Sequence, residues 1–163
     1  MSGAVNIQGG SLFIRGIGSI GAASAINVSN SGGGANATLG GGGGNFLGLA
    51  LVSSNANPAV DRVGNSTAIN LNGGNIGFGF PGGSTGTYTE TVGALSLLGG
   101  SNMIVTETAA SPSATTHLTF ASIARSPGAT VRFTDATVGA AGSKVIFTSA
   151  PALPGGIIGG WAT

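Results

Sequence analysis

One short phrase recurs along this chain and constrains its fold more than any other feature. It reads AVNIQ at 4–8, AINVS at 25–29 and AINLN at 68–72, with a degraded copy, ALSLL, at 94–98. A glycine pair directly follows three of the four copies. The copies start 21, 43 and 26 residues apart, which we interpret as one, two and slightly more than one unit of a spacing near 21. A short alternating strand with a glycine turn, repeated at this interval, is typical of a β-solenoid.

The composition indicates a chain that folds in spite of its glycine content. Glycine accounts for 33 of the 163 residues, and only nine residues are Lys, Arg, Asp or Glu. Leu, Ile, Val and Phe together number 40, whereas disordered chains are poor in these residues and rich in net charge. The length suits one domain with a real core, so we expect a single solenoid domain over 1–163.

The same composition argues against several classes of function. A net charge of +1 lacks the basic stripe that nucleic acid requires, and it gives little electrostatic protection against self-association. There is no cysteine, and hence neither a disulfide framework nor thiolate chemistry. No apolar run approaches the 18 residues of a membrane-spanning helix, and no basic segment followed by an apolar run marks a signal peptide at the start.

Strand-like alternation is frequent, and strong helix formers are scarce. The predicted strands are 5–8, 11–15, 25–29, 46–52, 68–71, 75–80, 87–92, 94–98, 102–107, 116–120, 130–134 and 144–148. Alternation directs matching apolar pairs inward, among them Ile26 with Val28 and Ile69 with Leu71. Asn6, Asn27 and Asn70 then face outward, or form an inward asparagine ladder; the sequence leaves both open.

These strands predict an all-β, parallel β-solenoid with about seven coils, glycine-rich turns and little or no helix. The segment 31–44 interrupts the pattern with runs of glycine, and we interpret it as an excursion from the coil in preference to a packed turn. The tail carries the only tryptophan, Trp161, which either caps the last coil or stacks on a further unit.

Two motifs resemble chemical sites. Residues 16–21 read GIGSIG after a predicted strand, but a dinucleotide site needs a helix next and an acid about 20 residues on, and the first acid is Asp61. A glycine-rich corner explains the motif better. Glu90 and Glu107, each between two threonines, would converge if they lay on neighbouring coils, as paired acids do in glycan-cleaving enzymes. We favour two solvated glutamates on an exposed face.

The remaining polar residues carry weaker hypotheses. His117, the only histidine, is expected to face solvent from a strand, without a triad partner. Alternating threonines at 87, 89 and 91 offer a flat outward row of the kind that binds ice, but the spacing is irregular between coils. Asp61 and Arg62 are interpreted as surface charges. We predict no catalytic, cofactor-binding or metal-binding residues, and the four acids are too dispersed for a calcium site.

Residues 66–163 resemble the repeat unit of autotransporter-associated β-strand repeat proteins. The matching phrases are TAINLNGG at 67–74, TVGALSLLGGS at 91–101, LTF at 118–120, RSPGATVRF at 125–133 and GIIGGWAT at 156–163. The resemblance implies a large bacterial surface or secreted protein, similar to the right-handed β-helical passengers used for display and adhesion. It implies no catalytic residues.

Together these observations predict a structural extracellular or cell-surface bacterial protein, not an enzyme, that acts in display, adhesion or end-to-end assembly into a filament. Solenoid ends expose unpaired strand groups, and no charged or helical cap is evident in the sequence at either end. Self-association is the expected partnership, and a surface glycan is a second partner class. The alternative function is a glycan-binding or glycan-cleaving β-helix that uses Glu90 and Glu107.

Overall fold

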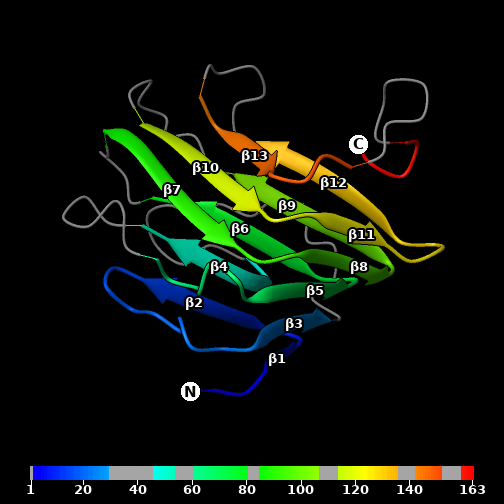
Figure 1. Cartoon of the computed structure of the whole chain (residues 1–163), viewed down its shortest axis with the longest axis horizontal. Helices are drawn as coiled ribbons and strands as arrows, with labels where there is room; N and C mark the ends of the chain where they lie inside the picture. Colours follow the sequence, from blue (N-terminus) through cyan, green and yellow to red (C-terminus); the bar gives the residue numbers. More distant parts are fainter. Residues whose placement is uncertain are drawn as a thin grey trace.

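The chain folds as a parallel β-solenoid, as the repeated phrase predicts. The computed structural model describes residues 2–29, 46–53, 61–80, 85–106, 114–135, 142–151 and 159–163. These residues form thirteen strands and no helix. All strand pairs are parallel, and the strands build three sheets that rise in tiers from the N-terminus to the C-terminus (Figure 1).

Each sheet collects one side of every coil that contributes to it. The first sheet contains β1 (Val5–Gln8), β3 (Ala25–Ser29), β5 (Ala68–Asn72), β8 (Leu95–Gly99) and β11 (Ile123–Arg125). The second contains β2 (Ser11–Arg15), β4 (Gly48–Val52), β6 (Asn75–Gly79), β9 (Ser101–Thr106) and β12 (Thr130–Asp135). The third contains β7 (Gly86–Val92), β10 (Ala114–Phe120) and β13 (Lys144–Phe147). Every predicted strand is present with its ends within two residues, and only the three-residue β11 was missed.

The predicted number of about seven coils is too high, because the first sheet has five strands and the described residues therefore form at most five coils. Asn27 pairs directly with Asn70, so the 43-residue interval is one long coil and not two short ones. Only the ladder positions must keep register. The connections between strands can vary in length, because a longer loop costs little additional closure entropy. The predicted 31–44 excursion, within this long coil, lies outside the described residues.

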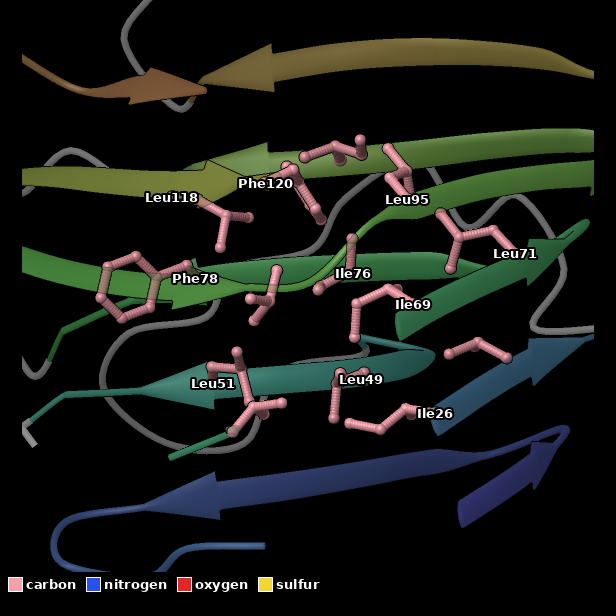
Figure 2. Close-up of a cluster of buried hydrophobic side chains, with 14 of the residues drawn as sticks. Ile26, Leu49, Leu51, Ile69, Leu71, Ile76, Phe78, Leu95, Leu118 and Phe120 are labelled. Carbon is pink, nitrogen blue, oxygen red and sulfur yellow. The ribbon is translucent and has the colours of Figure 1, made fainter. Parts of the chain in front are cut away.

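The core consists of apolar columns that run through successive coils. In the first sheet, Ile26, Ile69 and Leu95 are paired in register and fully buried. Leu49 and Ile76 continue the same arrangement in the second sheet, and their side chains meet those of the first sheet between the two layers (Figure 2). The predicted inward pairs are thus distributed over three sheets that share one core.

The second sheet is buried on its outer face as well as its inner face, which explains why β4 is apolar at every position. β4 and β6 are buried at every position, whereas β3 and β5 alternate. A second apolar cluster lies on this outer face and contains Phe46, Ala50, Met103 and Val105. Parallel strands covered on both faces read as continuous hydrophobic runs. The part of the predicted run that forms β4, Gly48–Val52, is therefore a buried strand, whereas Leu47 before it is exposed.

The asparagines of the repeated phrase form a ladder on the outside of the first sheet. Asn27 Nδ2 donates to Asn6 Oδ1, and Asn70 Nδ2 donates to Asn27 Oδ1, both at 2.7 Å. Their strand neighbours Ile26 and Ile69 point into the core. The asparagines therefore form a ladder, as in one of the alternatives that the sequence left open, but they face outward, as in the other.

The C-terminal residues pack on the last coil. Ala162 forms a parallel bridge with Val131, and Val131 and Phe133 donate their N–H groups to the carbonyls of Trp161 and Thr163. The guanidinium of Arg125 lies 5.3 Å from the centre of the Trp161 ring. Trp161 therefore covers part of the last coil, which is the first of the two roles that the sequence suggested.

Glycine is required at the corner between the third and first sheets. A Cβ at Gly93 would lie 2.5 Å from Ser66 O and 2.7 Å from Thr67 O, both of them backbone atoms that cannot rotate away. We expect Gly93→Ala to lower the free energy of unfolding by about 1–3 kcal/mol through this overpacking. Urea denaturation measures the effect. Gly3→Ala is the control, because a Cβ there meets nothing within 4 Å, and equal stabilities of the two variants would contradict the expectation.

The asparagine ladder gives a second prediction. Asn27→Ala removes two side-chain hydrogen bonds, whereas Asn6→Ala removes one. With about 1 kcal/mol for each bond, Asn27→Ala should cost about twice as much as Asn6→Ala. Thermal unfolding of both variants tests this ratio. A smaller loss for Asn27→Ala than for Asn6→Ala would show that the ladder does not act as a chain of bonds.

Candidate functional site

The most unusual group in the described residues is the carboxyl of Glu90, which lies inside the solenoid. Thr87, Thr89 and Thr91 face outward on β7, so Tyr88, Glu90 and Val92 face the core. Glu90 pairs in register with Leu118, which is fully buried. Only 1% of Glu90 is exposed. A carboxyl thus occupies a position that is apolar in the next coil.

The carboxyl oxygens of Glu90 accept hydrogen bonds from a corner of the chain that comprises residues 61–64. Oε1 accepts hydrogen bonds from the backbone N–H groups of Arg62 at 3.0 Å and Val63 at 2.9 Å. Oε2 lies 3.2 Å from the same Arg62 N–H. These bonds fasten the corner over the inner side of β7.

Arg62 is fully buried and links three coils. Its Nη2 donates to Gly16 O in the first coil, and its Nε donates to Val52 O in the second. Its Nη1 lies 3.7 Å from Glu90 Oε2 in the third coil. The guanidinium therefore satisfies carbonyl groups as well as facing the carboxyl, and backbone N–H groups make the short contacts to Glu90.

Burial controls the protonation of the pair. Desolvation raises the pKa of Glu90 to about 7, against the opposing effects of the N–H groups of Val63 and Arg62 and of the Arg62 charge. Burial also lowers the pKa of Arg62, although an arginine keeps its charge in proteins. Glu90 thus changes charge near neutral pH, far above the range of an exposed glutamate.

This geometry corrects two interpretations from the sequence. Glu90 is not a solvated glutamate, and Arg62 is not a surface charge, because both side chains are fully enclosed. Glu107, the other acid of the predicted pair, lies outside the described residues. A catalytic acid must reach its substrate, and the carboxyl of Glu90 reaches only the 61–64 corner. The arrangement suits a structural latch better than glycan cleavage.

The other motifs noted in the sequence, at residues 16–21, His117 and the threonines of β7, have structural roles. Residues 16–21 form the corner between β2 and β3, and a strand follows where a dinucleotide site would need a helix. His117 faces outward and lies with Nε2 2.8 Å from Gly142 O. Thr115 Oγ1 donates to Thr87 Oγ1 at 3.1 Å, so part of the predicted threonine row is joined across two coils. No group of three or more metal-ligating acids or histidines occurs within the described ranges.

The burial of Glu90 could have been predicted from the alternation of β7. The same pattern that turns the three threonines outward turns Glu90 inward with Tyr88 and Val92. Arg62 offered no comparable signal, because it lies on a corner without periodicity and its contacts come from residues 9 to 46 positions away in sequence. A buried acid in a chain with so few charges indicates that a cation or donor must lie nearby.

Comparison with known proteins finds no match for this chain among protein-family models, curated proteins or solved structures. In the described segments there is no helix long and apolar enough to cross a membrane.

The latch interpretation predicts a large loss of stability on removal of the carboxyl. Glu90→Ala leaves Arg62 buried without its counter-charge and two backbone N–H groups without an acceptor, so we expect a cost of about 3–5 kcal/mol. Chemical denaturation measures it. Thr89→Ala is the control, since its side chain faces solvent on the same strand and should cost no more than about 1 kcal/mol. Similar losses for the two variants would exclude an important role for the pair.

Proposed function

We propose that this chain is a structural β-solenoid segment of an extracellular or cell-surface bacterial protein, where it acts in display, adhesion or assembly. The observation that carries the proposal is the use of the polar groups inside the solenoid. Glu90 and Arg62 bind the 61–64 corner, and Asn102 accepts from Gly74 N and donates to Thr130 O. These groups hold successive coils together.

Edge strands support assembly as the mode of action. β1 and β2 lie at the N-terminal edge of the first and second sheets, and β11 and β13 lie at the opposite edge of the first and third. Edge strands present unpaired N–H and C=O groups that can pair with another chain. With a net charge of +1, repulsion between copies is weak.

The bacterial surface location rests on the resemblance of residues 66–163 to autotransporter-associated repeats. The alternative is a glycan-binding or glycan-cleaving β-helix. The burial of Glu90 disfavours cleavage. Binding would use the outer face of the third sheet, where Thr89, His117 and Lys144 are paired side by side in register. A solenoid that carries such a face is still a scaffold, so the structural proposal accommodates it.

Electron microscopy of the purified chain at micromolar concentration in physiological salt tests the proposal. We expect filaments a few nanometres wide that grow by strand pairing at the solenoid ends. Uniform monomers at all concentrations would contradict assembly, and display or adhesion by single molecules would remain.

A proline on the edge of β1 provides the matched variant. Gly9 donates its N–H to Ser29 O. Because N–H groups alternate in direction along a strand, the N–H of Ile7 also points toward β3, whereas the N–H of Gln8 points to the open side. Gln8→Pro removes that outward N–H and should abolish filaments while the unfolding midpoint changes little. Filaments that persist in this variant would exclude the β1 edge as the contact.

A further inference from the structure

The outer edge of β12 is paired with a terminal segment of the same chain, residues 161–163. Val131 donates its N–H to Trp161 O at 2.9 Å, and Thr163 donates its N–H back to Val131 O at 3.1 Å. Phe133 donates its N–H to Thr163 O at 2.7 Å. The bridge between the segment and Val131 is parallel, as in the sheets. The terminal segment therefore takes the place of a further strand in the second sheet.

The apolar columns of the core are incompletely covered where they begin and where they end. One inward column of the second sheet begins with Leu12 on β2 and ends with Phe133 on β12. One inward column of the first sheet begins with Val5 on β1 and ends with Ile123 on β11. These four residues are partly buried, whereas the members between them are buried. A second copy that continued both columns would bury all four.

We propose that the outer edge of β12 is the docking edge for β2 of a second copy of this chain, and that the terminal segment competes with that copy for it, an inference that rests on the proposed role in assembly. Continuation of the column places Leu12 of the second copy against Phe133. In a parallel ladder the N–H of Phe133 then donates to Ser11 O of that copy. Thr163 O holds this place in the structure, so the edge accepts one of the two strands at a time.

A second copy pairs with this edge over a longer stretch than the terminal segment does. β2 has five residues and pairs with β4 at each of them, whereas the terminal segment forms one isolated bridge with β12. The segment is held in addition by the guanidinium of Arg125, which lies 5.3 Å from the centre of the Trp161 ring. A net charge of +1 gives little repulsion between copies. A second copy can therefore displace the segment.

The competition predicts that a weakened terminal segment lowers the concentration at which copies assemble. The apparent affinity of an edge falls with the fraction of molecules in which that edge is free. Loss of one backbone hydrogen bond changes this fraction about fivefold, and loss of one cation–π contact about twofold. Removal of one contact of each kind should therefore shift assembly by about 10-fold.

The full chain with Trp161→Ala and Thr163→Pro tests this expectation. The first change removes the ring that faces Arg125, and the second removes the N–H that donates to Val131 O. Sedimentation over a range of concentrations, with electron microscopy of the pellets, should find filaments at a concentration about 10-fold lower than for the unaltered chain. Gly160→Ala is the control and should change nothing, because a Cβ there meets nothing within 4 Å. If urea denaturation shows that the double variant is unfolded, Thr163→Pro alone should give a shift of about fivefold.

Two substitutions at Ser11, made in the weakened chain, test whether β2 is the strand that docks. Gly48 donates its N–H to Gly10 O, so the next N–H, that of Ser11, points to the open side of β2. Both Ser11→Pro and Ser11→Ala lose the hydrogen bond from Ser11 Oγ to Phe46 O, but only the proline loses the outward N–H. Filaments should therefore need a concentration about fivefold higher with proline than with alanine.

The outcomes separate this competition from assembly itself. Filaments that form at the same concentration with and without the weakened segment would overturn the competition and leave assembly standing. Equal behaviour of the proline and alanine variants would overturn β2 as the docking strand. Monomers in every variant at all concentrations would overturn both the docking edge and the proposed assembly.

Discussion

Parallel pairing in strict register is the constraint on which this structure depends. Each strand must present the same face as the strands above and below it, because a slip of one residue turns every side chain to the other side of the sheet. Ile26, Ile69 and Leu95 satisfy this requirement in one column. Asn6, Asn27 and Asn70 satisfy it on the opposite face. The core and the outer ladder are therefore two consequences of one register.

The register fixes the strands but leaves the length of their connections free, which decides what the sequence can predict. The alternation of apolar residues identified nearly every strand, and Gly48–Val52, within the apolar run at 46–52, is buried as expected. The number of coils was wrong, because an interval of 43 residues looks the same whether it holds two coils or one long one. Pairing of Asn27 with Asn70 is a contact between distant residues, which no local pattern encodes.

The site shows the same division between local and distant information. The alternation of β7 places Glu90 on the inward face. The sequence analysis nevertheless predicted an exposed glutamate, because acids are rarely buried. The three-coil role of Arg62 could not be predicted, because Gly16, Val52 and Glu90 come together only when the long coil closes. β11, with Ala124 between Ile123 and Arg125, was too short to show a period and is identified only by its pairing with β8.

The position of Glu90 can be understood from the end of the third sheet. An apolar residue there would cover the core but would leave the N–H groups of Arg62 and Val63 buried without acceptors, at about 1–3 kcal/mol each. A carboxyl accepts both, and it brings a desolvation cost that is smallest when the group is neutral. The same residue therefore covers the core and supplies the acceptors that the 61–64 corner needs. Among the described strands, β7 is the last of the third sheet, and a side-chain acceptor on it takes the place that a backbone carbonyl has between paired strands.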